Sequence, residues 1–300
     1  MSNAKAWLEA ARLRTLPLSV SGILVGSFYA MSQGHKNWGI LALALVTTLG
    51  LQVLSNFAND YGDGVKGTDN EHRIGPQRAI QKGAITVSAM KKGIILTSVL
   101  TMVAAILLIY VSFGKENFGY SVFFFVLGLA AVGAAIKYTV GGNAYGYKGL
   151  GDLFVFIFFG LVSVIGCYFL FAKSLNELVI LPAISVGLLS VAVLNLNNMR
   201  DQRSDAMSGK NTLVVKMGPV VAKKYHYLVI GMALVLTLIF AVANDFRPVQ
   251  YIFLIAYIPL LLHIKTVVKN TEPRDLDPEL KKVALSTFLL SALLCIAMQL

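Results

Sequence analysis

The chain has 300 residues, of which 56% are hydrophobic and only 14% are charged, and its mean hydropathy is +0.70. A soluble protein of this length needs amphipathic or alternating patterning, and little of either is visible. The composition therefore excludes an ordinary soluble domain and predicts an all-α integral membrane protein.

Nine apolar stretches are long enough to cross a bilayer, which takes roughly 20 residues. In chain order we predict membrane helices over 15–33, 39–58, 93–113, 118–138, 151–172, 177–198, 225–243, 249–268 and 283–299. No linker or low-complexity segment interrupts them. We therefore expect a single membrane-embedded domain over 1–300, with nine helices around a central cavity.

The net charge of +11 follows from membrane topology and does not indicate nucleic-acid binding. With the N-terminus placed in the cytoplasm, 22 of the 26 Lys and Arg residues fall on the cytoplasmic side. This asymmetry matches the positive-inside rule. We expect a multi-pass protein of a bacterial-type inner (plasma) membrane, with its C-terminus outside and its long polar loops, 59–92 and 199–224, in the cytoplasm.

Two clusters of Asn and Asp residues stand where the second and sixth spans end. On a helix the members of each cluster share one face: Asn56, Asn59, Asp60 and Asp63 in the first, and Asn197, Asp201 and Asp205 in the second. Four spans separate the two clusters, so we expect two related four-helix units plus a ninth helix. Repeats of this kind place their matching sites around one shared cavity.

Facing carboxylates and amide oxygens are hard ligands, and such ligands suit Mg²⁺ together with substrate phosphates. Basic residues follow each cluster and would neutralise the charge on a diphosphate leaving group. They are Lys66, Arg73, Arg78 and Lys82 after the first cluster and Arg200, Arg203 and Lys210 after the second, and the Gly-rich loop 141–152 adds Lys148. The predicted guest is therefore a Mg²⁺-bound diphosphate at the cytoplasmic face.

Each of these features also has a plainer explanation. A single Asp-x-x-Asp at a helix end is usually a solvated cap, and topology alone requires Lys and Arg in cytoplasmic loops. Tyr138, Tyr145 and Tyr147 are typical of the aromatic belt at a membrane interface. Two matched clusters, each with Asn on its inner side, favour a site over a pair of caps.

Taken in order, the motifs resemble those of the UbiA superfamily of intramembrane aromatic prenyltransferases. The matching segments are Asn59-Asp60-Tyr-Gly-Asp63 with Arg73-Ile-Gly-Pro-Gln-Arg78, then Tyr147-Lys148-Gly-Leu-Gly-Asp152, and Asn197-Asn-Met-Arg200-Asp201 with Asp205 and Gly209-Lys210. They are most similar to the menaquinone-pathway branch, whose members prenylate 1,4-dihydroxy-2-naphthoate. The superfamily often has a third Asp where this chain has Gly67, and whether nearby Asp69 binds metal stays open.

The resemblance implies a UbiA-like fold and a Mg²⁺-dependent reaction between a polyprenyl diphosphate and an aromatic acid. Asp60, Asp63, Asp201 and Asp205 would hold Mg²⁺. Diphosphate ligands would be Asn56, Asn59, Arg73, Arg78, Lys148, Asn197, Arg200 and Lys210. Tyr138 or Tyr145 would stabilise the allylic cation. For dihydroxynaphthoate the reaction also releases CO₂ and yields demethylmenaquinone.

Two other functions are compatible with the same residues. One is prenyl transfer to a different aromatic acceptor, such as 4-hydroxybenzoate. The other is cation transport, in which the carboxylates would carry ions. Transport ligands are expected near the bilayer midplane, whereas these clusters lie at span ends among basic residues. The sequence does not define the prenyl chain length or the oligomeric state.

Overall fold

The computed structural model describes residues 3–70 and 74–300, and the chain is helical throughout this range apart from turns and loops. Nine helical segments of the described chain are long and apolar enough to cross a membrane. They are Ala4–Ser32, Trp38–Val65, Val87–Phe113, Phe118–Lys137, Gly151–Ala172, Glu177–Met207, Leu213–Ala243, Pro248–Lys269 and Pro273–Ala297. The predicted all-α class and the predicted order of spans are confirmed.

The spans contain shorter elements that break or bend them. In chain order the structure has α1 (Asn3–Ala11), η1 (Leu13–Thr15), α2 (Leu16–Ser32), α3 (Trp38–Val65), α4 (Val87–Phe113), α5 (Phe118–Lys137), η2 (Tyr145–Lys148), α6 (Gly151–Val155), η3 (Phe156–Gly166), α7 (Cys167–Ala172), η4 (Glu177–Val179), α8 (Ile180–Met207), α9 (Leu213–Ala243), η5 (Pro248–Ala256), α10 (Tyr257–Lys269), η6 (Pro273–Leu276) and α11 (Asp277–Ala297).

Several helices continue beyond the ends that hydropathy predicted. Helix α3 runs to Val65 and α8 to Met207, while α9 begins at Leu213. The segments 59–92 and 199–224 are therefore partly helical and not loops throughout, whereas their cytoplasmic position stays a prediction. Hydropathy ends a span where polar residues begin, but a helix satisfies its own backbone hydrogen bonds and can continue with polar side chains.

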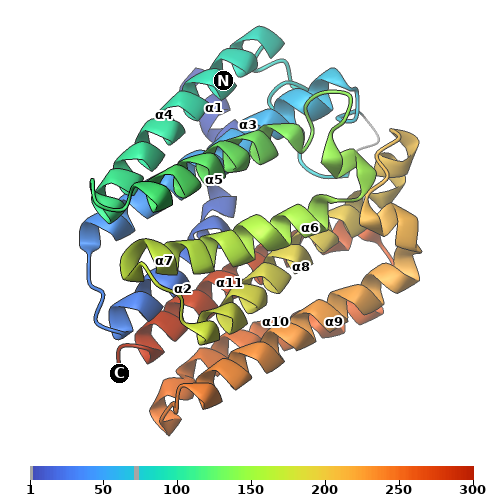
Figure 1. Cartoon of the computed structure of the whole chain (residues 1–300). Coiled ribbons are helices and arrows are strands. Elements are labelled where there is room, and N and C mark those ends of the chain that lie inside the picture. Colours follow the sequence, from blue (N-terminus) through green and yellow to red (C-terminus); the bar gives the residue numbers. More distant parts are fainter. Residues whose placement is uncertain (1–2, 71–73) are drawn as a thin grey trace.

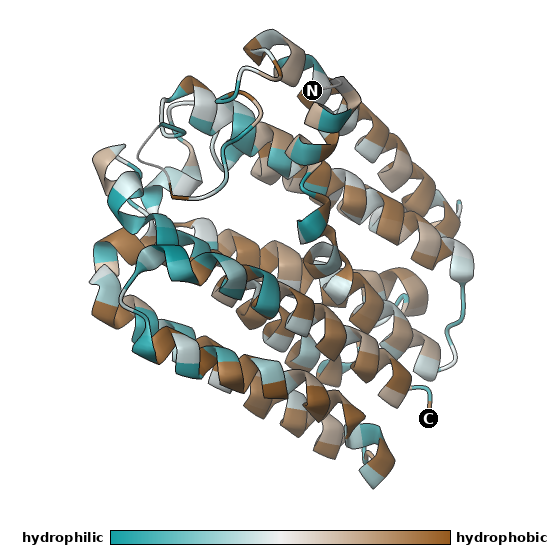
Figure 2. Ribbon diagram, turned by 180° about the vertical axis from the view of Figure 1, so that it is seen from behind, coloured by the Kyte–Doolittle hydropathy of each residue, from teal (hydrophilic) through white to brown (hydrophobic). Residues whose placement is uncertain are grey.

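The helices form two groups with a space between their ribbons (Figure 1). Helix α3 packs against α4 and α5, with α1 beside them, and the other group contains α2 and α6 to α11. The N- and C-terminal ends lie at opposite ends of the molecule in Figure 1, as an odd number of spans requires. Figure 2 shows hydrophilic residues concentrated at the end that contains the long connections.

Close helix contacts hold the larger group together. Segment η3 is a π-helix of 11 residues, and its Gly160 lies against Gly187 of α8 so closely that an added Cβ would be 2.6 Å from the Gly187 Cα. Long π-helices are rare and widen the helix locally. The missing side chains at this crossing allow the wider helix to approach α8.

A buried polar chain links α9, α10 and α11. The Nε2 atoms of His226 and His263 are 2.7 Å apart, and Nδ1 of His263 is 2.5 Å from a Glu279 carboxylate oxygen. Both imidazoles are fully buried. Because the carboxylate accepts from Nδ1–H, a neutral His263 accepts at Nε2 and His226 donates there. The three helices are thus joined by directional bonds inside an apolar interior.

Candidate active site

A cavity of about 790 Å³ opens within the helical bundle. Its polar end is lined by Asn59, Asp60, Asp63, Arg78, Asn197, Arg200 and Lys210. Its apolar part is lined by Phe124, Leu127, Val162 and Leu170, among others. The cavity therefore combines a charged head with hydrocarbon walls, a shape suited to an amphipathic guest.

Asp60 and Asp63 of α3 are both buried and both bound by guanidinium groups. Arg12 and Arg78 share the Asp60 Oδ1 atom, and Arg78 also lies 3.1 Å from Asp63 and 3.3 Å from Asp69. Burial alone would lower the pKa of Arg78, but four carboxylates, those of Asp63, Asp69, Asp60 and Asp201, raise that pKa above its ordinary value. Arg78 is thus a permanent cation at the centre of the first cluster.

Lys210 joins the two acidic clusters. Its Nζ lies 3.8 Å from Asp63 of α3 and 3.6 Å from Asp205 of α8. The Tyr147 hydroxyl donates to Asp63 over 2.7 Å, and the Lys66 ammonium lies 3.9 Å from the centre of the Tyr147 ring. Carboxylates from opposite halves of the chain therefore face the same small volume, as the matched motifs predicted.

The second cluster is held by Arg200. Its guanidinium donates to both oxygens of Asp201, at 2.9 and 2.6 Å, and to the Asn197 amide oxygen at 2.8 Å. A further donor, Nη1, lies 2.5 Å from Asp277 at the start of α11. Arg200 therefore positions the carboxylate of Asp201 and ties it to the last helix.

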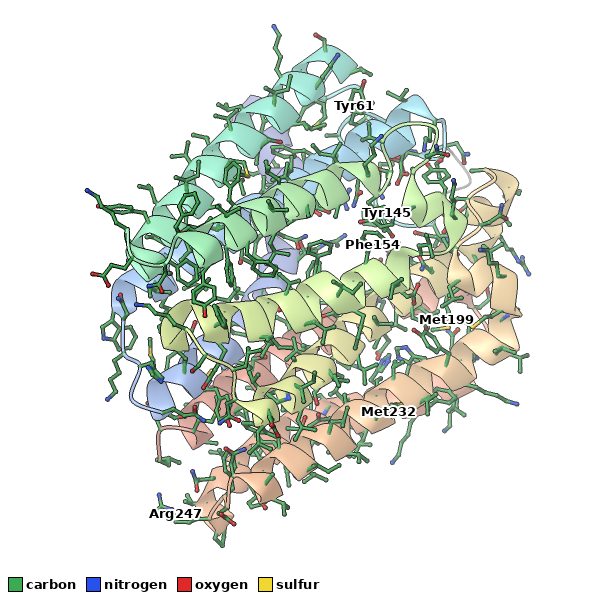
Figure 3. All side chains as sticks on the ribbon, viewed as in Figure 1. Tyr61, Tyr145, Phe154, Met199, Met232 and Arg247 are labelled. Carbon is green, nitrogen blue, oxygen red and sulfur yellow. The ribbon has the colours of Figure 1, made fainter. Side chains whose placement is uncertain are left out.

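An aromatic wall faces the cavity below the carboxylates. Tyr145 stacks on Phe154 with ring centres 3.9 Å apart and contacts Tyr138 edge-on at 5.4 Å. Figure 3 shows Tyr145 and Phe154 between the two groups of helices. The Tyr145 hydroxyl donates to the Ala134 carbonyl, which fixes the ring. Electron-rich ring faces are suited to stabilising a nearby carbocation.

Some predicted site residues lie elsewhere or have other partners. Lys148 is exposed and donates to Asn143, outside the set of residues that line the cavity. Asn56 lines the cavity but uses its amide nitrogen to bind the Ala11 carbonyl, and Asn59 accepts from a threonine hydroxyl. Arg73 lies outside the described residues. The roles predicted for these residues remain predictions.

Four residues at this site were absent from the predicted set: Arg12, Tyr147, Phe154 and Asp277. From the sequence, Arg12 was one of several basic residues predicted on the cytoplasmic side. Tyr147 was typical of a tyrosine in the aromatic belt at a membrane interface. Asp277 precedes the last span without a motif. The Tyr147-Lys148-Gly motif was the signal in the sequence that pointed to Tyr147.

The donor set is compatible with Mg²⁺ but does not form a complete protein cage. Among the described residues, no three Asp, Glu, His or Cys side chains converge into a metal site. Mg²⁺ usually keeps water and takes one or two carboxylates together with substrate phosphates. Lys210 lies between carboxylates of the two clusters. This arrangement is compatible with a metal that is bound partly by these carboxylates and partly by a diphosphate.

Comparison with known proteins identifies the family. The profile described as "UbiA prenyltransferase family" matches residues 19–296. The chain belongs to the UbiA prenyltransferase family. It is a multi-pass membrane prenyltransferase, and the resemblance seen in the motifs is confirmed. Membership of this enzyme family also removes the support for the cation-transport alternative.

Two curated relatives match almost the full chain. A 1,4-dihydroxy-2-naphthoate octaprenyltransferase of Haemophilus influenzae is 44% identical over 96% of this chain and 94% of its own length. An enzyme of the same name from Escherichia coli K12 is 42% identical over 98% of this chain and 94% of its own length.

Two solved structures share the fold. One is a digeranylgeranylglyceryl phosphate synthase, with a TM-score of 0.59, 18% identity and complete coverage of both chains. The other is a UbiA homolog from Archaeoglobus fulgidus bound to DMAPP and Mg²⁺, with a TM-score of 0.57 and 15% identity over 96% of this chain and 99% of that chain. At these identities the similarity supports the fold alone, and it confirms the predicted UbiA-like architecture.

Proposed function

We propose that the protein transfers a polyprenyl group from a polyprenyl diphosphate to 1,4-dihydroxy-2-naphthoate. The reaction depends on Mg²⁺, releases diphosphate and CO₂, and forms demethylmenaquinone in its reduced form. The observation that carries the proposal is the cavity, whose charged head continues directly into apolar walls. The names of the two full-length relatives support the choice of acceptor.

Some of the site residues would bind the metal, and others would bind the phosphate. Asp60, Asp63, Asp201 and Asp205 would hold Mg²⁺, because they are the carboxylates of the two facing clusters. Bound Mg²⁺ would neutralise negative charge on the diphosphate as it leaves. Arg78 lies among three carboxylates and, together with Lys210, would supply hydrogen-bond donors to the phosphate oxygens.

In the chemical step, the allylic cation must react with the acceptor before it reacts with water. The C1–O bond breaks and both electrons leave with the diphosphate. Ring faces of Tyr145 and Phe154 shield the cation. The acceptor carbon that bears the carboxylate attacks C1, and the electrons of its bond to CO₂ then restore the aromatic ring. The apolar walls exclude water from this sequence.

The test is product analysis by mass spectrometry with purified protein, a long prenyl diphosphate and either 1,4-dihydroxy-2-naphthoate or 4-hydroxybenzoate. We expect a decarboxylated, prenylated naphthalenediol and little prenylated hydroxybenzoate. Faster turnover of 4-hydroxybenzoate would overturn the acceptor assignment. Asp60→Ala and Asp201→Ala should each remove Mg²⁺-dependent turnover, and full activity in both would overturn the metal assignment.

We also propose that the polar end of the bundle faces the cytoplasm of a bacterial-type cell, with the protein in the inner membrane. The charge asymmetry supports this orientation, and the opposite positions of the chain ends agree with an odd number of spans (Figure 1). A reporter that is active only in the periplasm, fused after Leu300, should be active. An inactive C-terminal reporter combined with an active N-terminal one would reverse the orientation.

A further inference from the structure

The cavity extends far beyond the two acidic clusters. Its lining includes Ala44 and Asp60, which lie on the continuous helix α3. A helix rises about 1.5 Å per residue, so these two positions are about 24 Å apart. On α5, the lining residues Phe124 and Tyr138 are about 21 Å apart by the same measure. The cavity therefore runs from its charged head along α3 and α5, across most of a hydrocarbon core that is about 30 Å thick.

Four aromatic side chains pack together at the end of the cavity opposite the charged head. They are Phe113 of α4, Tyr120 and Phe124 of α5, and Phe169 of α7, and we call them the far-end aromatic cluster. The ring centres of Phe113 and Phe124 are 5.2 Å apart, and the nearly parallel rings of Phe124 and Phe169 are 5.8 Å apart. Tyr120 meets Phe169 edge-on at 5.0 Å. Phe124 lines the cavity, and Phe113, which packs against it, is buried.

The far-end aromatic cluster connects the two groups of helices. Helices α4 and α5 belong to one group and α7 to the other, and a space separates the ribbons of the two groups (Figure 1). Helix α4 also packs directly against α7. Aromatic rings are large and have few rotatable bonds, so a packed set of them forms a firm boundary. The cavity therefore ends where the rings of α5 meet the ring of α7.

The distance from the charged head to Phe124 limits how much of a prenyl tail can lie straight. An extended chain advances about 1.2 Å per bond, as the polypeptide backbone does, so an isoprene unit with four bonds along the chain spans about 5 Å. About four or five units therefore fit between the diphosphate and the far-end aromatic cluster. The wall along this path is apolar and includes Leu127 and Val162. A longer tail that follows the same path reaches the ring of Phe124 before it ends.

We propose that the far-end aromatic cluster determines the length of prenyl tail that the cavity holds in an extended form, with Phe124 as the residue that the tail meets. The inference rests on the proposed function and names the residues that select among prenyl diphosphates. A tail of up to five units lies straight against the apolar walls. Further units must bend at Phe124, which gives up tail freedom and packing contacts. The position of the cluster therefore sets the relative use of short and long tails.

A competition between tail lengths tests the proposal. Purified protein in detergent receives 1,4-dihydroxy-2-naphthoate and an equimolar mixture of prenyl diphosphates with four to eight units, and mass spectrometry measures the products. In Phe124→Ala we expect the ratio of eight-unit to four-unit product to rise about threefold over wild type, because removal of the ring relieves crowding at the end of the cavity. Phe124→Leu, which removes less volume, should give a smaller rise. The comparison with wild type cancels differences in how the substrates partition into detergent.

A substitution that shortens the cavity should have the opposite effect. Gly128 lines the cavity one helical turn closer to the charged head than Phe124, and an added Cβ there would lie 4.0 Å from the Met102 Cε atom, an ordinary contact. Gly128→Leu should move the end of the cavity by about 5 Å, or one isoprene unit, and lower the same product ratio about threefold. Phe125→Ala is the matched control, because Phe125 is exposed beside Phe124 and is not part of the cavity lining. It should keep the wild-type ratio.

Binding without an acceptor separates this proposal from the proposed function. The probes are prenyl thiolodiphosphates of four and eight units with Mg²⁺, whose bridging sulfur slows ionisation, and the rise in melting temperature measures their binding. Relative to the four-unit probe, the eight-unit probe should stabilise Phe124→Ala more than wild type and Gly128→Leu less. If wild-type protein does not prenylate dihydroxynaphthoate, the proposed acceptor is wrong, and these probes still decide the role of the cluster. If Phe124→Ala does not fold, Phe124→Leu takes its place. Unchanged preferences, or shifts in one direction for both substitutions, would overturn the proposal.

Discussion

Removing one hydroxyl group, in Tyr147→Phe, should slow prenyl transfer about tenfold. The hydroxyl donates to Asp63 over 2.7 Å. A hydrogen bond to a charged group contributes roughly 1.5–3 kcal/mol. Asp63 keeps Arg78 at 3.1 Å and Lys210 at 3.8 Å, so we take the lower value, about 1.5 kcal/mol, which corresponds to about tenfold in rate.

The assay is kcat/KM with saturating Mg²⁺, measured beside Tyr168→Phe. Tyr168 donates to the neutral Gln33 side chain over 2.6 Å, on a different helix pair from the cavity head, and its loss should leave kcat/KM within twofold. Burial, and then the Asp63 carboxylate, raise the pKa of Tyr147. Its hydroxyl is therefore protonated and able to donate to Asp63 at neutral pH. Identical rates for the two Phe variants would refute the reasoning.

Three further changes test other parts of the structure. Asp277→Asn should lower kcat/KM about fivefold, because Arg200 loses an ion pair of about 1 kcal/mol at a partly exposed carboxylate. His263→Phe should lower the free energy of unfolding by about 2 kcal/mol, since it leaves buried partners unpaired, with KM values unchanged; thermal melting in detergent measures this. Gly160→Ala should cost about 1–3 kcal/mol by overpacking, whereas Gly133→Ala, with open space around it, should melt as wild type.

The membrane fold follows from the sequence because its signal is local. Continuous apolar runs of bilayer length define helices one at a time, and the described chain contains such helices in the predicted order. Hydropathy did not give the ends of α3 and α8 at the polar side of the bundle, because it does not detect helical turns whose polar side chains face a cavity. Asp63 lies in the last turns of α3 for this reason, and Asp205 lies in those of α8.

The acidic stripes were predictable because helical spacing alone puts Asp60 and Asp63 on one face. The partners of these carboxylates were not. Arg12 contacts Asp60 because Arg12 itself has a left-handed backbone conformation, which turns the chain at this point. Sequence composition does not predict that conformation at an arginine. Asp277 reaches Arg200 across 77 sequence positions. Contacts of this kind depend on how helices pack, and the predicted division into two four-helix units remains a prediction.

Ion pairs balance the charge of the carboxylates that lie buried together at the cavity. Asp63 and Asp205 share Lys210, and Asp201 has Arg200. Each carboxylate that would bind Mg²⁺ must first give up a cation, and a displaced buried cation is costly unless an anion takes it. Diphosphate is such an anion. When Mg²⁺ and diphosphate bind together, each cation displaced from a carboxylate can pair with a phosphate oxygen. When Mg²⁺ binds alone, the displaced guanidinium and ammonium groups have no anion to pair with. We therefore expect the metal and the diphosphate to bind together.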